Sequence, residues 1–275
     1  MSAPLRTCAV VLAGRREGQV DPLAAAAGLA DKCLVPVAGR PMIAHVLAAL
    51  AASPEIGRIV VSVNDPELLD DIEDVRELRA EGRLVVCRAR TNLVDSVFEA
   101  VGLATFPVLV TTADNALLSP AAVGEFLAGA RAAGAEVAVA FARRASVLAA
   151  HPEGQRRFYR FADESYSNCN SYWIGDAAAL GVAEVFRSGG QFAKHPVRIV
   201  QAFGFVNLVR FHYGIGTLAA AFRRFSRRFG LAIHPVILSD GAVAIDVDNA
   251  RTLAVTEAIF AARAASAPVE HRAAG

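Results

Sequence analysis

Residues 10–18 read VVLAGRREG, an apolar strand that runs directly into a glycine turn. In α/β proteins a turn at the end of a strand commonly binds a phosphate. A dinucleotide-binding turn needs the pattern G-x-G-x-x-G, and a Walker loop needs G-x-x-x-x-G-K-[ST]. Here Gly14 is followed by two arginines and Gly18 by a glutamine, so the stretch fits neither pattern.

The turn instead combines backbone N–H groups with positive charges. Arg15 and Arg16 follow Gly14 directly, and Lys32 opens the apolar segment KCLVPVAGRP at residues 32–41. Guanidinium forks, a lysine ammonium and the N–H groups of a turn all bind phosphate oxygens. This combination predicts a triphosphate site, with solvated loop charges as the equally weighted alternative.

Valine-rich runs recur along the first half of the chain and alternate with helix-like stretches. This alternation predicts a parallel α/β sheet, and the unbroken apolar character of the runs predicts strands covered on both faces. A helix is expected to begin near Pro41, and another after Ser119 as N-cap with Pro120 at its first position. The predicted strands are 7–13, 58–63, 83–88, 107–113 and 136–142.

The pattern changes after residue 142. Residues 156–174 alternate polar and aromatic side chains, which indicates two β segments around a loop at 163–170. We expect residues 195–230 to be mostly helical and GAVAIDV at 241–247 to form a final strand before a last helix. One domain is therefore predicted over 1–264, with an NTP-binding half (1–142), an acceptor-side elaboration (143–230), a closing strand and helix (231–264), and a flexible tail (265–275).

Composition restricts the partners. The 275 residues are 54% hydrophobic with a formal net charge of +1, which gives no overall attraction to nucleic acid or to an anionic membrane. The four cysteines form no CxxC pair and suit reduced, buried thiols. The histidines lack metallohydrolase spacing, and no GxSxG elbow is present. No apolar segment is long enough to span a bilayer, so a cytoplasmic protein is expected.

Carboxylates follow two of the predicted strands. Asp114 comes directly after PVLVTTA, at the end where open α/β sheets bind ligands. Asp246 and Asp248 share one face if their segment is extended. Mg²⁺ takes one or two protein carboxylates together with substrate phosphates, so these residues are candidate ligands. Capping of the last helix is an equally weighted alternative for Asp248.

The segments VVLAGRREG and DKCLVPVAGRPMIAHVLAAL resemble the signature LAGG-x-G-x-R…K-P-L-x-P-v-x-G-x-P-l-i of MobA-like NTP transferases. This group includes molybdenum-cofactor guanylyltransferase-like proteins and the sugar-phosphate and methylerythritol-phosphate nucleotidylyltransferases. The likeness extends over residues 1–142 and, more weakly, 231–264. The chain departs from the signature at Arg15, where the family usually has a second glycine, and in a longer loop before Lys32.

The resemblance implies a Rossmann-like, mixed and mostly parallel sheet of the GT-A type, in three αβα layers. It implies metal ligation by Asp114 and Asp246, with Asp248 second, and catalysis by Lys32, Arg16 and Asp114. The implied nucleotide-binding residues are Leu12, Ala13, Gly14, Arg15, Asn92 and Ser96, and the implied acceptor-binding residues are Asn168 and Asn170. For Asn92 and Ser96 the alternative is N-capping of the helix by Asn92 or Asp95, and for Asn168 and Asn170 it is simple turn chemistry.

The resemblance thus implies a nucleotidyltransferase that depends on Mg²⁺ or Mn²⁺. An acceptor phosphate would attack the α-phosphate of an NTP and release pyrophosphate. No general base is needed, because a phosphomonoester has its second pKa at about 6 and is largely ionised near neutral pH. A glycosyltransferase that uses a nucleotide-sugar and a non-catalytic nucleotide-binding protein are the alternatives. Lys32 in the N-terminal signature argues against the first, and its retention with Asp114 and Asp246 argues against the second. The base and the acceptor stay open between molybdopterin, a sugar phosphate and a lipid-linked phospho-alcohol.

A basic helix is predicted around AAAFRRFSRRFG. Phe222, Phe225 and Phe229 share one helical stripe, flanked by four arginines at 223, 224, 227 and 228. Burial of the phenylalanines with solvated arginines is the favoured interpretation. Peripheral contact of residues 219–230 with an anionic lipid surface is the alternative.

Overall fold

The computed structural model describes residues 6–15, 20–181, 209–210 and 213–266. Its strands are β1 (Thr7–Leu12), β2 (Pro36–Val37), β3 (Arg40–Pro41), β4 (Ile56–Val63), β5 (Leu84–Arg88), β6 (Val108–Thr112), β7 (Val137–Arg143), β8 (Tyr159–Arg160), β9 (Ser165–Ile174) and β10 (Ile233–Leu238). Its α-helices are α1 (Pro22–Ala26), α2 (Met42–Ala51), α3 (Glu73–Ala80), α4 (Leu93–Gly102), α5 (Pro120–Ala132), α6 (Arg144–Ala150), α9 (Leu218–Phe229) and α10 (Ala250–Ser266). Short 3₁₀ helices are η1 (Lys32–Leu34), η2 (Pro66–Leu69) and η5 (Gly241–Ala244).

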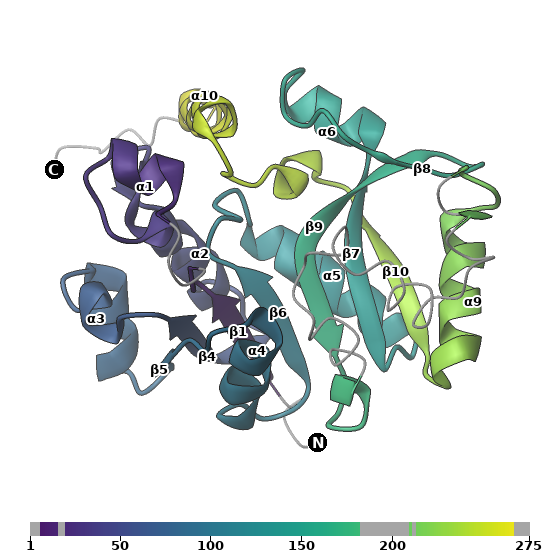
Figure 1. The fold of residues 1–275 in the computed structure, drawn as a ribbon, viewed down its shortest axis with the longest axis horizontal. Coiled ribbons are helices and arrows are strands. Elements are labelled where there is room, and N and C mark those ends of the chain that lie inside the picture. The colour runs from purple at the N-terminus through teal and green to yellow at the C-terminus, as the bar shows by residue number, and fades with distance from the viewer. Residues whose placement is uncertain (1–5, 16–19, 182–208, 211–212, 267–275) are drawn as a thin grey trace, which may run out of the picture.

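A central sheet joins strands from both halves of the chain in the order β10-β7-β9-β6-β1-β4-β5, with β8 added to β9 (Figure 1). The pairs β1–β4, β1–β6, β4–β5 and β7–β10 are parallel. Strand β9 is antiparallel to both of its neighbours, β6 and β7. The predicted mixed, mostly parallel αβα architecture is therefore confirmed.

Helices cover both faces of this sheet, and β1 shows why its sequence is continuously apolar. Ala9 and Val11 enter a core cluster that also holds residues of α2 and α5, whereas Cys8 and Val10 enter a second cluster with residues of α4 and α9. Alternate side chains of a strand point to opposite faces, so a strand buried on both needs an apolar residue at every position. The expected two-sided cover of the strands is confirmed.

The predicted helix starts are also confirmed. The Ser119 hydroxyl accepts a hydrogen bond from the Ala122 N–H at 3.2 Å, and Pro120 opens α5. Pro41 occupies the N-cap position of α2. A hydroxyl acceptor and a proline are both suited to a helix start, where backbone N–H groups lack intrahelical partners.

The predicted final strand at 241–247 is wrong. Asp240 accepts from the Ala242 N–H at 2.9 Å and starts η5, and Gly241 packs against the backbone of Ser146 where a side chain would not fit. The last strand is instead β10, which was not among the predicted strands. Pro235 interrupts its apolar run, so the sequence pattern there is weak. Proline is tolerated there because, among the described strands, β10 lies at the edge of the sheet and pairs only with β7.

The predicted loop at 163–170 is also wrong, because β9 begins at Ser165 and runs to Ile174. Two β segments do occur, since β8 pairs with β9 across a short turn. Helix α9 confirms part of the helical prediction for 195–230, and residues 195–208 and 211–212 lie outside the described residues. Helix α10 ends at Ser266, so most of the predicted tail also lies outside them.

The phenylalanine stripe of α9 is the inner face of that helix. Phe222 is buried, and Phe225 and Phe229 pack partly buried against the same core cluster. Burial of the phenylalanines is confirmed, and three of the arginines are exposed, but Arg224 is half-buried with its Nε lacking a hydrogen-bond partner among the described residues. Lipid contact through 219–230 stays a prediction that depends on the arginines. All four cysteines are free thiols. Within the described ranges, no helix is both long and apolar enough to cross a bilayer.

Candidate active site

Leu12, Ala13, Gly14 and Asp114 lie at the carboxyl ends of β1 and β6, which are side by side in the sheet, whereas Asn92 and Ser96 lie after β5. The chain continues from β1 to β4 on one side and returns later to β6 on the other. Ligands of open α/β sheets bind at such a reversal of strand order. The Leu12 carbonyl accepts from the Ala113 N–H at 2.9 Å, and Ala13 donates to the Ser62 carbonyl at 2.8 Å, so the start of the turn is fixed to both neighbouring strands.

Gly14 follows at the point where β1 ends. A Cβ added to Gly14 would lie 2.9 Å from the Cβ of Ala89, which is closer than real side chains approach. Gly14 therefore lets the turn pack against the loop after β5. A phosphate contact by Leu12, Ala13 or Gly14 stays a prediction.

Arg15 makes local contacts in the structure. Its guanidinium donates to the Ala30 carbonyl at 2.9 Å and pairs with Asp31 at 3.6 Å and Asp65 at 3.4 Å. The Asp31 side chain is only 1% exposed, and its oxygens have no hydrogen-bond partner among the described residues. Burial raises the pKa of Asp31, and the Arg15 charge opposes that rise.

An arginine in place of the family's second glycine therefore has a structural role, because it supplies the counter-charge of a buried carboxylate. Binding of phosphate by Arg15 stays a prediction that requires the guanidinium to leave these partners. Arg16 lies outside the described residues.

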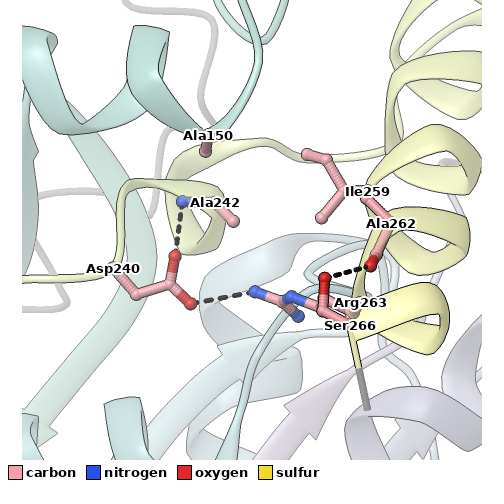
Figure 2. A pocket seen from close by; sticks show the side chains of 7 residues that line it. All are labelled: Ala150, Asp240, Ala242, Ile259, Ala262, Arg263 and Ser266. Atoms are coloured by element: carbon pink, nitrogen blue, oxygen red, sulfur yellow. Dashed lines mark hydrogen bonds and ion pairs between the residues drawn. The ribbon is translucent and has the colours of Figure 1, made fainter. Parts of the chain in front are cut away.

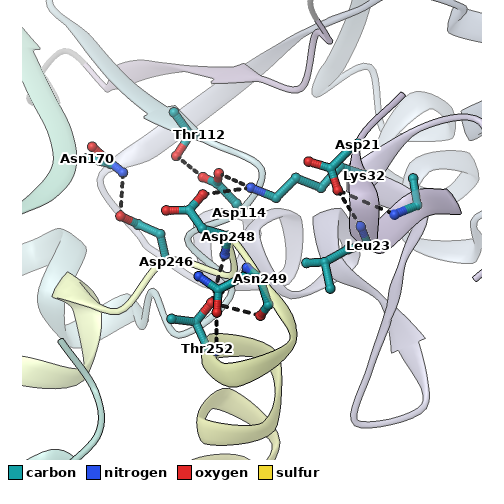
Figure 3. A network of polar contacts seen from close by, with 11 residues as sticks. Asp21, Leu23, Lys32, Thr112, Asp114, Asn170, Asp246, Asp248, Asn249 and Thr252 are labelled. Carbon is teal, nitrogen blue, oxygen red and sulfur yellow. Dashed lines mark hydrogen bonds and ion pairs between the residues drawn. The ribbon is translucent and has the colours of Figure 1, made fainter. Parts of the chain in front are cut away.

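Lys32 lies at the centre of a charged network (Figure 3). The turn η1 places its ammonium 2.8 Å from Asp114 Oδ2 and 2.9 Å from Asp248 Oδ1. The other oxygen of Asp114, Oδ1, accepts from the Thr112 hydroxyl at 2.6 Å. Burial alone would lower the pKa of Lys32, but the two carboxylates outweigh it and hold the pKa above its ordinary value. Lys32 is therefore a fixed positive charge.

Asp246 completes the cluster from the segment before α10. Its Oδ2 accepts from Asn170 Nδ2 at 2.7 Å, and its Oδ1 is buried without a hydrogen-bond partner in the described part of the chain. The next residue, Val247, donates its N–H to the Asp114 carbonyl at 3.0 Å, which ties the two carboxylate-bearing segments together. Burial raises the pKa of Asp246 well above its usual range, and repulsion from Asp114 and Asp248 raises it further.

This arrangement fits a divalent cation bound together with substrate. The Lys32 ammonium pairs with two carboxylates, and Asp246 beside them has a buried oxygen without a hydrogen-bond partner among the described residues. Over the described residues, no three His, Cys, Asp or Glu side chains form a ready metal cage. Mg²⁺ does not require such a cage, because it usually binds one or two carboxylates, several waters and substrate phosphates.

Asp248 is not the cap of α10. Asn249 Oδ1 accepts from the Arg251 and Thr252 N–H groups at 3.1 and 3.2 Å, whereas the Asp248 carboxylate bonds to Lys32. The capping interpretation of Asp248 is therefore wrong. A neighbouring asparagine satisfies the free N–H groups of the first turn, which releases the aspartate for the charged network.

We expect Asn249→Ala to lower the free energy of unfolding by about 1 kcal/mol, the usual cost of losing an N-cap side chain. Asp248→Ala is expected to cost much less, because the cap stays intact. Urea unfolding of both variants beside the wild type measures the difference. An equal or larger loss in Asp248→Ala would contradict this assignment of the cap.

Asn92 and Ser96 both make structural contacts. Asn92 Oδ1 accepts from the Asp95 N–H at 2.9 Å and caps α4, as the alternative interpretation predicted. The buried Ser96 hydroxyl accepts from the Arg90 N–H at 2.9 Å and lies 3.0 Å from the Asn92 carbonyl. These two residues hold the loop after β5 in place, and their contact with a base or ribose stays a prediction.

The structure also places the two asparagines predicted to bind the acceptor. Asn168 uses both ends of its amide internally, since Nδ2 donates to the Tyr172 hydroxyl at 3.0 Å and Oδ1 accepts from the Asn170 N–H at 2.7 Å. Asn170 contacts Asp246 instead. Sequence reasoning also missed Thr112, the last residue of β6, whose hydroxyl reaches Asp114 across the turn that follows the strand.

A separate open hollow of about 450 Å³ lies between η5 and α10 (Figure 2). Its polar lining consists of Asp240, Arg263 and Ser266, and Asp240 pairs with Arg263 at 2.9 Å. None of the predicted site residues lines it. The hollow is therefore not part of the Lys32 network.

Comparison with known proteins gives a family to this geometry. The model of the MobA-like NTP transferase domain matches residues 9–240, and the chain therefore belongs to this family of nucleotidyltransferases. The matched region contains Lys32 and Asp114, whereas Asp246 and Asp248 lie beyond it. No curated protein matches the chain.

Solved structures share the fold. A hypothetical transferase from Thermus thermophilus superposes with a TM-score of 0.74 at 24% identity, over 90% of this chain and 99% of that one. CMP:2-keto-3-deoxy-manno-octonic acid synthetase complexed with CTP gives 0.56 at 15% identity, over 94% and 99%. The 4-diphosphocytidyl-2C-methyl-D-erythritol synthase of Anaerococcus prevotii gives 0.54 at 10% identity, over 93% and 96%.

Proposed function

We propose that this protein is a magnesium-dependent nucleotidyltransferase that transfers a nucleoside monophosphate from an NTP to a phosphorylated acceptor. The Lys32 network carries the proposal, because it places one ammonium and three carboxylates, one with an unpartnered oxygen, at a sheet edge suited to nucleotide phosphates. Two structures with the same fold are named as a CMP:2-keto-3-deoxy-manno-octonic acid synthetase complexed with CTP and a 4-diphosphocytidyl-2C-methyl-D-erythritol synthase, so both names contain a cytidine nucleotide.

In the reaction, an acceptor phosphate oxygen forms a bond to the α-phosphorus of the NTP. The bond from that phosphorus to the α–β bridging oxygen breaks, and pyrophosphate leaves with the electron pair. The acceptor phosphate is already ionised near neutral pH, so no protein base has to remove a proton. The site is expected to act by positioning and by charge stabilisation.

Asp114 and Asp246 are the residues that would hold the cation, with Asp248 second. Bound magnesium supplies charge neutralisation of the triphosphate and Lewis-acid polarisation of the α-phosphate. Lys32 stabilises negative charge that develops on the phosphates, and Thr112 keeps Asp114 oriented. A triphosphate must compete with Asp114 and Asp248 for the Lys32 ammonium, so nucleotide and cation binding are expected to be coupled.

The first test is thermal stabilisation by ATP, GTP, CTP and UTP, each with Mg²⁺ and with EDTA. We expect one nucleotide to raise the melting temperature only with Mg²⁺, because the cation neutralises the triphosphate beside the carboxylates. A ligand at 100 times its Kd stabilises a protein by about 2.7 kcal/mol, which is enough to measure. That nucleotide is then incubated with sugar phosphates, phospho-alcohols and molybdopterin, and pyrophosphate release is measured. Lack of stabilisation by all four nucleotides would make the proposal wrong.

Lys32→Met distinguishes the effect of the Lys32 ammonium on the reaction rate from its effect on cation binding. We expect kcat/KM for pyrophosphate release to fall about 100-fold, the usual cost of removing one transition-state charge contact. Mn²⁺ binding without nucleotide is expected to tighten, because the lysine no longer competes for Asp114 and Asp248. Arg40→Met, which removes a surface cation paired with Asp74, serves as control and should change neither quantity. Weaker Mn²⁺ binding in Lys32→Met would contradict this role.

A further inference from the structure

Strand β9 contains a bulge beside the charged network. Along β7, Val139 pairs with Tyr172 and Phe141 pairs with Asn168, so a two-residue step on β7 faces a four-residue step on β9. Inside this bulge Asn170 has a φ of +46°. Few side chains adopt this left-handed conformation readily, and asparagine is one of them.

Three side chains, those of Asn168, Asn115 and Ser171, hold the bulge in one conformation. The Asn168 Oδ1 accepts the Asn170 N–H at 2.7 Å. The Cys169 carbonyl accepts from the buried Asn115 Nδ2 at 3.0 Å and from the Ser171 hydroxyl at 3.2 Å. Because these bonds satisfy the backbone groups that the bulge removes from the sheet, the direction of the Asn170 side chain is fixed by the fold.

That direction brings the Asn170 amide to Asp246 (Figure 3). Asn170 Nδ2 donates to Oδ2 at 2.7 Å, and Oδ1 of the same carboxylate has no hydrogen-bond partner in the part of the chain that the structure describes. We infer that Asn170 is a positioning residue that occupies one oxygen of Asp246 and leaves the other for the metal. The inference rests on the proposed function and gives Asn170 a role other than binding the acceptor.

The identity of the residue follows from two requirements. The position needs a left-handed backbone, and the carboxylate needs a neutral hydrogen-bond donor. Glycine meets the first requirement without the second, and alanine meets neither. An aspartate would tolerate the backbone but would place a second negative charge against Asp246. Asparagine meets both requirements.

The decisive variant is Asn170→Gly, which keeps the backbone conformation and removes the amide. Mn²⁺ is titrated by electron paramagnetic resonance in the presence of the nucleotide that stabilises the wild type, below the unfolding transition of each protein. We expect the Mn²⁺ Kd to rise at least about tenfold, as is usual when a group that orients a metal ligand is lost. Urea unfolding of Asn170→Gly in EDTA is expected to remain a single cooperative transition, which loss of folding would not allow.

Tyr172→Phe is the matched control, because it removes the Asn168–Tyr172 hydrogen bond of the same bulge and leaves the contact to Asp246. Its Mn²⁺ Kd should equal that of the wild type. Asn170→Ala should lose the same Mn²⁺ affinity as Asn170→Gly but melt at a lower temperature, because its Cβ strains the left-handed backbone.

The outcomes separate the two proposals. A wild type that binds no Mn²⁺ with any nucleotide would overturn the proposed function. A wild type that binds Mn²⁺ and an Asn170→Gly variant that binds it equally well would overturn the positioning role alone. A loss of affinity in Tyr172→Phe as large as in Asn170→Gly would also overturn it, since general loosening of the bulge would then be enough.

Discussion

Asp114→Asn is expected to lower the rate of pyrophosphate release by about 1,000-fold and to remove the Mg²⁺-dependent rise in melting temperature. In the proposed function, Asp114 provides both a metal ligand and one of the two carboxylates that hold Lys32. An amide keeps the shape and the hydrogen bond from Thr112 but loses the charge, and a neutral ligand binds Mg²⁺ far more weakly than a carboxylate. Removal of one strong electrostatic contact to the transition state already costs about 100- to 1,000-fold.

Asp240→Asn is the matched control for this loss. Asp240 is also paired with a cation, Arg263 at 2.9 Å, and an asparagine can still cap η5. It lies in the separate hollow, so its replacement should leave both the rate and the Mg²⁺ response unchanged. Activity of Asp114→Asn within tenfold of the wild type would contradict a central role for this carboxylate.

Asp246→Asn is expected to reduce activity by about 100- to 1,000-fold and, at neutral pH, to make the metal-free protein more stable. The buried carboxylate is disfavoured first by burial and then by repulsion from Asp114 and Asp248. An amide removes that repulsion, and its oxygen can still accept from Asn170. Functional residues often reduce stability in this way, so the same substitution should change the two properties in opposite directions.

The stability difference should depend on pH with a defined sign. The pKa of Asp246 is higher in the folded protein than its ordinary value of 3.8. Its contribution to stability is therefore fully present below the unfolded pKa and is lost as the pH rises through the folded pKa. Urea unfolding in EDTA should give similar stabilities for the two proteins below about pH 4, and a more stable Asp246→Asn at pH 7.5. A less stable variant at pH 7.5 would contradict this electrostatic account.

The sequence predicted most of the strands because two-sided burial requires unbroken apolar runs, which valine-rich segments display directly. It also predicted one site for Lys32 and Asp114, which the structure brings to 2.8 Å. Asp246 and Asp248 were assigned to the same site through a predicted strand at 241–247 that the structure does not contain. The same pattern failed at 241–247, where alternating small and apolar residues surround a glycine that packs against another backbone. It failed again at β10, where a proline is acceptable only because the strand is an edge.

The parts of the site that could not be predicted depend on tertiary structure. No local pattern indicates that β9 contains a bulge at Asn170, because the bulge is held by Asn115 from another segment. Arg15 looked like a phosphate-binding charge, and only the structure shows the buried Asp31 that it neutralises. The cap of α10 could belong to Asp248 or Asn249 by sequence, and the position of Lys32 decides between them.

The hydrogen bond from the Val247 N–H to the Asp114 carbonyl has a consequence for synthesis of the protein. Lys32 and Asp114 leave the ribosome long before Asp246 and Asp248, so a growing chain holds only half of the charged cluster. Under the proposed function, chemistry on a triphosphate has to wait until the segment before α10 has packed against the turn that follows β6.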